Sequence, residues 1–517
     1  TETLVIGAAY VGPVMRGASS SHCAAAVRIG RLCRDQMGSD IDDVLVEFDP
    51  NGSLATTHTG HGSDMGLFGG LLGWEAHDER LPDSANAIRR AGIDIRIDIV
   101  DIQASHPNTY RITLRNSRET RNVTAISTGG GMIEVVAIDG AAVSIAGDYH
   151  ETLVYTDSAR HLLEAIGESI ACESALLCDG PSPFVEIKSR QALSDVEVDR
   201  LGELKGATAV RKLAPVLPIL SRRELEVPFT TCEEMLAYNE GRGLDLWELA
   251  VHYESARGGI TGEEVFEKMK QIVDIMRSSI NCGLEGTVYE DRILGTQSVN
   301  FERQMKEKKL VGGDVLNRII MFVTAMMEVK SSMGVIVAAP TAGSCGALPG
   351  AILGVAVDRP EEEAIRAMLA AGMIGVFIST GATFAAEVGG CQAECGSGSG
   401  MAAAAIVGLA EGTLHQSLAA ASMALQNSLG LICDPIGNRV EAPCLGRNVQ
   451  AATNALSCAN MALADYDHLI PLDQVIDTMD EVGQSIVPEL RCTSLGGLSI
   501  SPASQAIESE LETNQRK

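Results

Sequence analysis

Residues 367–380 read AMLAAGMIGVFIST, and residues 401–410 read MAAAAIVGLA. Neither stretch has the polar face of a surface helix, and their alanine and glycine residues allow helices to pack closely. Each stretch is shorter than the about 20 apolar residues that cross a bilayer. We therefore expect buried core helices at both places. Small residues stay frequent from 221 to 517, which predicts a large all-α domain over this range.

The connectors between these expected helices are rich in glycine and cysteine, whereas loops are usually polar. They read GTVYEDRILG (286–295), PTAGSCGALPG (340–350), EVGGCQAECGSGSG (387–400) and CDPIGNRVEAPCLGRN (433–448). This departure from ordinary loop composition makes the connectors the first place to look for a functional site.

Residues 1–148 alternate between helical and strand patterns. A helical pattern at 24–37 is followed by strand-like runs, with Gly129-Gly130-Gly131 among the turn residues that separate them. The runs are 43–49, 93–102, 109–114 and 132–138. The pattern predicts an N-terminal α/β domain with a mostly antiparallel sheet.

Residues 149–220 follow the order strand, helix, strand, strand, helix, strand, with Gly180-Pro181-Ser182-Pro183 as the central turn. This order is typical of small split-βαβ modules. The segment resembles an ACT-like module, a class that often binds amino acids at dimer interfaces, and a purely structural role is the alternative. The fold class expected for the whole chain is therefore multidomain α+β.

The composition limits the functions open to the chain. Its formal net charge is −28 over 517 residues. A protein this acidic repels phosphate backbones and anionic membranes, so we expect neither nucleic acid nor membrane as a partner. The N-terminal TETLVIGAAY has no basic start followed by a long apolar run, and the thirteen cysteines fit free thiols better than a disulfide framework. These features favour a cytoplasmic enzyme.

Residues 17–26 read GASSSHCAAA, where three hydroxyl side chains and a histidine precede a small, apolar helix. Serine is a preferred helix cap. The same residues with a helix N-terminus also suit a small anion, because free backbone N–H groups and the helix dipole favour negative charge there. Both interpretations remain open on the residues alone.

Three cysteines lie at helix-breaking junctions: Cys391 after Gly389-Gly390, Cys433 before Asp434-Pro435, and Cys444 after Pro443. A proline beside a thiol fixes the local backbone, which favours a preset ligand geometry. No tight C-x2-C pair is present, so the residues alone leave two interpretations, a three-cysteine metal site or buried core cysteines.

Several short motifs occur in an order that resembles a known family. The N-terminal motifs are Ser19-Ser20-Ser21-His22 with Arg28, His61-Gly62-Ser63-Asp64, His106-Pro107-Asn108, and Ser127 through Gly131. The C-terminal motifs are Pro340-Thr341-Ala342-Gly343, Glu387-Val388-Gly389-Gly390-Cys391-Gln392-Ala393-Glu394, Cys433-Asp434-Pro435, and Pro443-Cys444 with Arg447-Asn448. Together they resemble the iron–sulfur-dependent L-serine dehydratases of bacteria, in the form that fuses a small and a large domain in one chain.

The resemblance implies a [4Fe–4S] cluster held by Cys391, Cys433 and Cys444. Cys345 and Cys395 are then packing residues. Three thiolates leave one iron without a protein thiolate, and that iron can act as a Lewis acid on a leaving hydroxide. The implied reaction removes water and ammonia from L-serine and gives a 2-keto acid such as pyruvate.

The resemblance also implies the roles of other residues. His61 is expected to be the catalytic base and His22 to orient the substrate. His106 is expected only to position a loop. The expected substrate-binding residues are Ser19, Ser20, Ser21, Thr341, Gly343 and Asn448.

The chain departs from the family pattern near the expected pocket. The departures are Ala18, Cys23, Ala342 and Ser399, and the last thiol of the chain is Cys492 rather than a terminal cysteine. Because of these departures, the substrate could also be another β-hydroxy or a β-thiol amino acid. The alternatives are therefore an L-cysteine desulfidase, a hydroxy-acid dehydratase, or a non-catalytic amino-acid sensor. The strand edges of the ACT-like segment make a homodimer the expected assembly.

Overall fold

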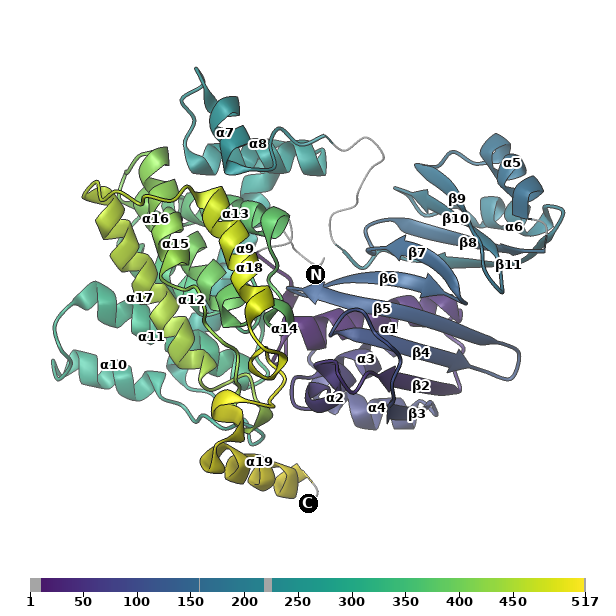
Figure 1. Ribbon diagram of the computed structural model, residues 1–517, viewed down its shortest axis with the longest axis horizontal. Helices are drawn as coiled ribbons and strands as arrows, with labels where there is room; N and C mark the ends of the chain where they lie inside the picture. Colours follow the sequence, from purple (N-terminus) through teal and green to yellow (C-terminus); the bar gives the residue numbers. More distant parts are fainter. Residues whose placement is uncertain (1–10, 158, 218–225, 516–517) are drawn as a thin grey trace.

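The computed structural model describes residues 11–157, 159–217 and 226–515, and Figure 1 shows a helical part beside two β-sheets. The first sheet has six strands in the order β3-β2-β4-β5-β6-β7, in which only the β2–β3 pair is parallel. These strands are β2 (Asp43–Phe48), β3 (Asp94–Ile99), β4 (Thr109–Arg115), β5 (Thr120–Gly129), β6 (Met132–Ile138) and β7 (Ala141–Ile145). The predicted mixture of helices and sheets, with a helical C-terminal part, is confirmed.

Helices cover one face of this sheet. They are α1 (Ala25–Gln36), α2 (Leu54–Thr57), α3 (Ser63–Leu71), the short 3-10 turn η2 (Leu81–Asp83) and α4 (Ser84–Arg90). Along β4, Tyr110, Ile112 and Leu114 alternate with more exposed residues, as expected for a strand with one buried face. They form one core with Ile29 and Leu32 of α1. The core fixes α1, and with it the histidine-bearing segment just before α1.

The second sheet has four strands in the order β11-β8-β10-β9, and all its pairs are antiparallel. Its elements are β8 (His150–Thr156), α5 (Ala159–Ser169), β9 (Ser174–Cys178), β10 (Phe184–Ser189), α6 (Asp195–Glu203) and β11 (Ala207–Leu213). The element order is the one expected, and the strand order is that of a split-βαβ fold. The end of the expected last strand falls in 218–225, outside the described residues. Ligand binding by this part stays a prediction.

The rest of the described chain is almost entirely helical. The longer helices are α7 (Cys232–Asn239), α8 (Leu246–Gly258), α9 (Gly262–Glu285), α10 (Ser298–Lys306), α11 (Asp314–Ser331), α12 (Ala347–Val355), α13 (Glu361–Gly381), α15 (Ser397–Leu409), α16 (Leu414–Gln426), α17 (Cys444–Leu463), α18 (Leu472–Ser485) and α19 (Pro502–Gln515). Shorter pieces are α14 (Ala386–Gly389), η3 (Gln392–Gly396), η4 (Ile436–Asn438), η5 (Pro488–Leu490) and η6 (Gly497–Ile500).

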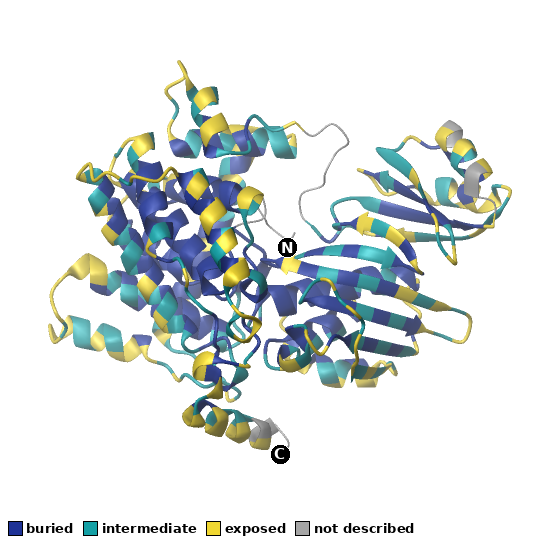
Figure 2. Cartoon of the chain, in the orientation of Figure 1, coloured by how far each residue is buried: buried dark blue, intermediate teal, exposed yellow. Residues whose placement is uncertain are grey.

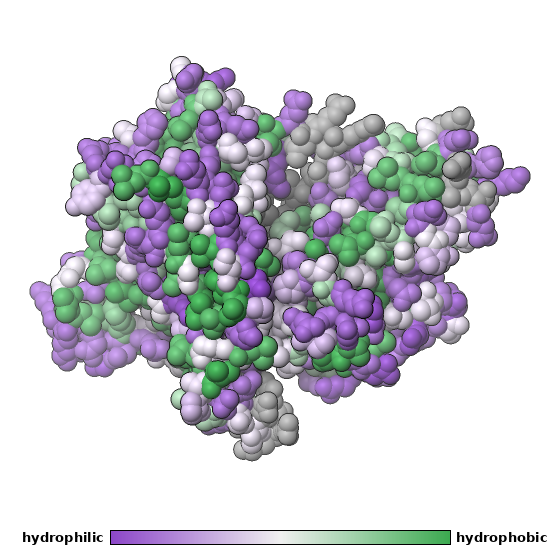
Figure 3. All heavy atoms as spheres, in the orientation of Figure 1, coloured by the Kyte–Doolittle hydropathy of each residue, from purple (hydrophilic) through white to green (hydrophobic). Residues whose placement is uncertain are grey.

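The two apolar stretches form central helices. In α15, residues 397 to 407 are all buried, and the interior of the helical part is dark blue in Figure 2. The helix α13 is 21 residues long, which is enough to span a bilayer, whereas the apolar stretch within it is too short. However, 78% of its most apolar window is buried against protein. Hydrophilic side chains are also spread over the face of the helical part seen in Figure 3, so α13 is best explained as a core helix.

One feature was not predicted: the N-terminal segment belongs partly to the helical core. The strand β1 (Val14–Met15) pairs antiparallel with β12 (Ile336–Val337), which lies between α11 and α12. Val11, Val14 and Met15 pack in the main helical core. Since residues 19–22 follow directly, this two-stranded ribbon places them at the junction between the sheet and the helical part.

The packing of α1 on α3 gives a testable expectation. A Cβ at Gly66 would overlap the carbonyl oxygen of Cys23, a backbone atom that cannot move away freely. We expect Gly66→Ala to lower the free energy of unfolding by about 1–3 kcal/mol and to displace the neighbouring His22. In the control Gly408→Ala the added methyl meets no atom within 4 Å, so stability should stay equal or rise by up to about 1 kcal/mol. Denaturant unfolding measures both, and equal stabilities for the two variants would contradict the tight contact between α3 and the Cys23 backbone just before α1.

Candidate active site

The two motif-rich segments enter their helices through π-helical turns. The turn η1 (Ser20–Ala24) runs directly into α1, and η3 runs directly into α15. Such turns are rare and occur often at functional sites. Of the two interpretations left open for Ser19–Ser21, the helix cap is wrong: no side chain caps either η1 or α1. The π-turn occupies the positions where an ordinary cap would form.

His22 is completely buried and held on both ring nitrogens. Its Nε2 lies 2.9 Å from Thr57 Oγ1, and its Nδ1 lies 3.1 Å from Ser19 Oγ. The same Nδ1 is 3.3 Å from Glu387 Oε1 of α14. Burial, with a smaller contribution from His58, lowers the pKa of His22 to about 3. A neutral ring fixed in this way suits the orienting role expected for His22.

His61 is also fully buried, but neither of its ring nitrogens has a hydrogen-bond partner among the described residues. Its ring packs edge-on against His22, with the ring centroids 4.8 Å apart. Burial and the nearby His22, Lys330 and Arg439 hold the pKa of His61 well below its usual value. Buried polar atoms are almost always paired in native proteins. An unpaired, neutral imidazole is therefore free to accept a proton from a bound molecule.

The hydroxyl groups of the serine run are engaged by protein. Besides the Ser19 contact, Ser20 Oγ accepts a hydrogen bond from the backbone N–H of Ala342 at 3.1 Å. Ser21 hydrogen-bonds to Glu387, which partly offsets the increase in the pKa of this carboxyl group that burial causes. The serine run thus joins the N-terminal motif to residues 342 and 387, far away in the sequence.

The loop that carries Thr341 and Gly343 lies against Glu394 of η3. The Thr341 hydroxyl donates to Glu394 Oε1 at 2.7 Å, and a Cβ at Gly343 would lie only 2.7 Å from both carboxylate oxygens. Burial, with the nearby Cys391 and Glu387, raises the pKa of Glu394 to about 8. Glu387 and Glu394 stood in the quoted motif but were given no role, because sequence alone does not show that their carboxyl groups are buried together.

Asn448 makes hydrogen bonds to four backbone groups, and its Nδ2 also contacts the Cys395 thiol at 3.6 Å. Its Oδ1 accepts from the N–H groups of Gly346 and Ala347 at 3.1 and 2.9 Å. Its Nδ2 donates to the carbonyl groups of Gly343 and Cys444, both at 2.8 Å. An amide side chain has two acceptor sites and two donors. Asn448 therefore holds the 343–347 loop against the start of α17, and its side chain has no hydrogen-bonding position left for a substrate.

His106 behaves as expected for a residue that positions a loop. Its Nδ1 accepts the backbone N–H of Asn108 at 3.1 Å. Asn108 in turn is one of the neighbours that lower the pKa of Glu387 against the effect of burial. His106 thus acts on the site only through its neighbour.

The cysteines expected to bind a cluster lie in one buried region. Cys391, Cys395, Cys433 and Cys492 belong to a small apolar cluster, and Cys444 is buried at the start of α17. All five thiols are free. A backbone pairing joins Cys433 to the segment of Cys492, whose N–H donates to the Cys433 carbonyl oxygen at 2.9 Å. The distance of 59 positions between Cys433 and Cys492 hid this proximity from the sequence analysis.

The thiols interact electrostatically. A hydrogen bond with Cys395 and the nearby Arg447 guanidinium lower the pKa of Cys391, although burial opposes them. Burial raises the pKa of Cys444, and a hydrogen bond with Cys492 raises that of Cys433. A thiol with a lowered pKa beside a cation is the kind that readily becomes a thiolate ligand.

The donor set can be tested against an iron–sulfur cluster. Within the described residues, no three His, Cys, Asp or Glu side chains are close enough to hold a single metal ion. In a four-iron cluster, however, each cysteine binds a different iron, so the sulfur ligands lie farther apart than around one ion. The buried thiols of Cys391, Cys433 and Cys444, none of which forms a disulfide, fit that requirement by their chemistry.

Comparisons with known proteins support the family resemblance that the motifs indicate. Residues 241–499 match the family described as Serine dehydratase alpha chain. The chain belongs to the L-serine dehydratase family. The probable L-serine dehydratase alpha chain of Bacillus subtilis is 35% identical over 285 residues, which cover 55% of this chain and 95% of that protein. The probable beta chain of the same organism is 33% identical over 212 residues, 40% of this chain and 96% of that protein.

A third member of the L-serine dehydratase family resembles this protein over nearly its whole length. The L-serine dehydratase of Mycobacterium bovis is 29% identical over 524 aligned residues, which cover 95% of this chain and 97% of that protein. Alpha and beta chains that are separate in Bacillus subtilis thus correspond to a single polypeptide here. The fusion is consistent with a site whose histidines and thiols come from different parts of the chain.

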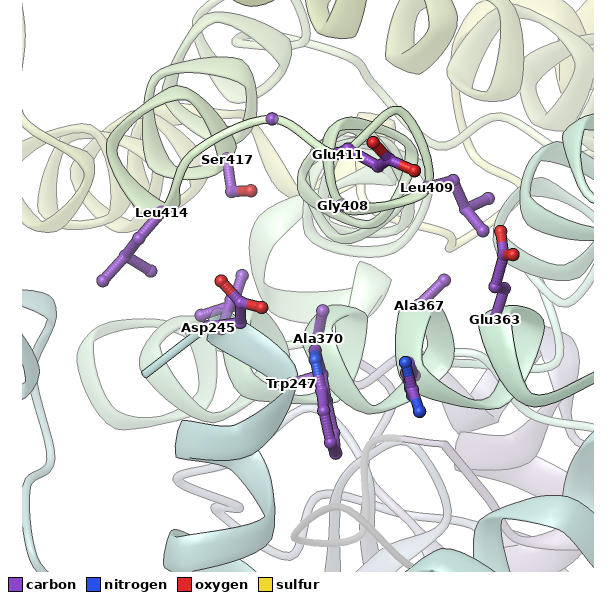
Figure 4. Close-up of a pocket in the computed structure, with 13 residues that line it drawn as sticks. Asp245, Trp247, Glu363, Ala367, Ala370, Gly408, Leu409, Glu411, Leu414 and Ser417 are labelled. Carbon is purple, nitrogen blue, oxygen red and sulfur yellow. The ribbon is translucent and has the colours of Figure 1, made fainter. Parts of the chain in front are cut away.

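Two cavities lie in different places relative to this site. One, of about 480 Å³, is lined by Gly60 and Gly62, the residues on either side of His61. The other, of about 320 Å³, contains none of the motif residues. Figure 4 shows the indole of Trp247 and the carboxylates of Asp245, Glu363 and Glu411 around it. Of these two cavities, only the first therefore borders the candidate site.

Proposed function

We propose that this protein is a [4Fe–4S]-dependent L-serine dehydratase that converts L-serine to pyruvate and ammonia. The observation that carries the proposal is the contact of His22 Nδ1 with Glu387 Oε1 at 3.3 Å. This contact joins the histidine half of the site to the segment that bears Cys391. Cys391, Cys433 and Cys444 would hold the cluster, which supplies a Lewis acid for the departure of hydroxide when it is bound.

In this proposal His61 removes the α-proton of the substrate. A base must be unprotonated at neutral pH and close to the proton that it takes. His61 satisfies the first condition because its pKa is lowered, and its unpaired nitrogens are free for the second. His22, held by Thr57 and Ser19, packs against the His61 ring and keeps it in place.

The proton leaves the α-carbon and hydroxide leaves the β-carbon, which gives an enamine. The enamine tautomerises to an imine, and water hydrolyses the imine to the keto acid and ammonia. No electron transfer is needed. The protonated carboxyl group expected for Glu394 near neutral pH, beside Thr341, can donate a hydrogen bond without adding negative charge to the site.

An anaerobic assay with L-serine, L-threonine and L-cysteine tests the proposal. We expect keto acid from L-serine at a kcat/KM at least about tenfold above that for the other two, since one methyl group or an altered leaving group costs about 1–3 kcal/mol in a fitted pocket. The amount of keto acid formed is measured through its reduction by a coupled dehydrogenase. Preference for L-cysteine with release of sulfide would instead identify a desulfidase, and no product from any of the three would refute the lyase assignment.

We also propose that the protein acts as a cytoplasmic homodimer without nucleic acid or membrane partners. The edge strand β9 of the second sheet supports an interface there, because its Leu176 side chain is 53% exposed. Sedimentation equilibrium of the full chain tests the assembly.

A further inference from the structure

The cavity beside His61 lies between the two large parts of the protein. Its volume is about 480 Å³. One wall comes from the N-terminal part, between Thr59 and Arg89, and the other comes from Tyr289, Lys330 and the segment Arg439–Glu441 of the helical part. The cavity therefore leads from the junction of the two parts toward the proposed base.

Lys330 stands out among the charged groups that line this cavity. It lies in the last turn of α11, it is 1% exposed, and its Nζ donates to the carbonyl oxygen of Val440. Among the residues that the structure describes, no carboxylate oxygen lies within 4.0 Å of Nζ. By contrast, Arg439 forms an ion pair with Asp291, and Arg89 is exposed at the rim. Lys330 is thus a buried cation whose charge is not matched by an adjacent anion.

A buried ammonium group without a counter-ion is costly, and an ammonium group has three hydrogens to donate. The carbonyl groups at the end of α11 supply some negative charge. However, the bond to Val440 uses one hydrogen of the Lys330 ammonium group and leaves the others available. Two carboxyl groups are within electrostatic reach, Glu394 and Glu441. Burial raises the pKa of both, and that of Glu394 reaches about 8, so this group is mostly uncharged at neutral pH. The pocket is arranged to receive an anion at Lys330.

We propose that Lys330 binds the carboxylate of the amino-acid substrate at the inner end of this cavity. The inference rests on the proposed function, because it assumes that an α-amino acid enters the site. The carboxylate is one bond from the α-carbon, so the group that binds it must lie close to the base, and Lys330 is near enough to His61 to affect its protonation. The hydroxyl groups of Ser19, Ser20 and Ser21, which the sequence suggested for this task, hydrogen-bond to protein groups instead.

Binding of L-alanine to the cluster-loaded enzyme tests this assignment without turnover. L-Alanine has the carboxylate and ammonium groups of L-serine but no hydroxyl group to eliminate. Isothermal titration should show that Lys330→Gln weakens L-alanine binding by about 30-fold or more, as expected when one member of a buried charge pair is removed. Lys330→Met should behave alike, and Lys330→Arg should retain most of the affinity. In turnover, Lys330→Gln should raise the KM for L-serine more than it lowers kcat.

Two controls make the result specific. Arg89→Gln removes the same charge from the exposed rim of the same cavity and should change L-alanine affinity less than about threefold. Iron content and melting temperature of each variant establish that the cluster and the fold are retained. If Lys330→Gln misfolds, Lys330→Met, which keeps the apolar stem, decides the question.

The outcomes separate this inference from the proposed function. Unchanged L-alanine binding in Lys330→Gln or Lys330→Met overturns the assignment of Lys330, and so does a loss of kcat with normal L-alanine affinity. Failure of the wild-type enzyme to bind L-alanine overturns it as well. If L-alanine binds in a Lys330-dependent manner but L-serine yields no keto acid, the proposed function fails while the carboxylate site stands.

Discussion

Replacing Cys391 with alanine is expected to remove the iron from the protein and to lower dehydratase activity by at least about three orders of magnitude. The thiol is 1% exposed, and its pKa is lowered by Cys395 and Arg447, which favours the thiolate that a cluster needs. Loss of one of three ligands leaves the proposed cluster without a stable attachment. Lewis-acid assistance supplies several kcal/mol of transition-state stabilisation, and about 1.4 kcal/mol corresponds to each tenfold change in rate. Iron analysis, visible absorption and the anaerobic serine assay measure the effect.

Cys345→Ala is the matched control, because it removes an equally buried thiol whose contact is with Met327 Sδ, in line with the packing role expected for it. This variant should keep its iron and most of its activity. Cys395→Ala is the more demanding comparison, since Cys395 hydrogen-bonds to Cys391 in the same cluster of side chains. If Cys395→Ala lost its iron and Cys391→Ala kept it, Cys395 would be the ligand and Cys391 the packing residue.

The sequence predicted those parts of the structure that depend on local pattern. The alternation along β4 and the apolar stretches of α13 and α15 lie within single elements, so neighbouring residues suffice to identify them. The pairing of β1 with β12 was invisible because each strand has only two residues, too few to show an alternating pattern. The helix cap, one of the two interpretations left open for the serine run, is absent because a propensity for serine at helix starts does not distinguish an α-helix from the π-turn found at Ser20–Ala24.

The candidate site was only partly accessible to sequence reasoning. His22, His61 and the three cysteines lie in recognisable motifs, so the sequence alone identifies them as candidates. Lys330 has no motif, and its importance lies in its burial and in the absence of a nearby carboxylate among the described residues, which depend on the three-dimensional packing. Asn448 was assigned to the substrate by its motif, but its hydrogen bonds are made to backbone groups and to the Cys395 thiol. A motif therefore indicates that a residue matters at the site without determining what it touches.

Replacing His61 with alanine is expected to lower kcat by about 10²–10⁴-fold, the usual contribution of a positioned general base. The iron content should remain that of the wild-type enzyme, because His61 packs against His22 rather than against the thiols. The comparison variant is His106→Ala, which removes an imidazole that accepts the N–H of Asn108. Its kcat should fall much less. A His61→Ala enzyme that retains kcat would exclude His61 as the base and direct attention to His22.

The pH dependence distinguishes a base from a merely structural histidine. The pKa of His61 is lowered by burial and by its neighbours His22, Lys330 and Arg439, so the ring stays unprotonated well below the usual histidine value of 6.5. A base works in its unprotonated form, and a lowered pKa therefore extends activity toward acid. We expect the kcat/KM of the wild-type enzyme to stay level as the pH falls through 6.5. If Lys330 is neutralised in Lys330→Gln, the repulsion that disfavours a protonated His61 is reduced, and the acid limb should move to higher pH. An acid limb that stays in place would mean that the Lys330 charge does not influence the catalytic base.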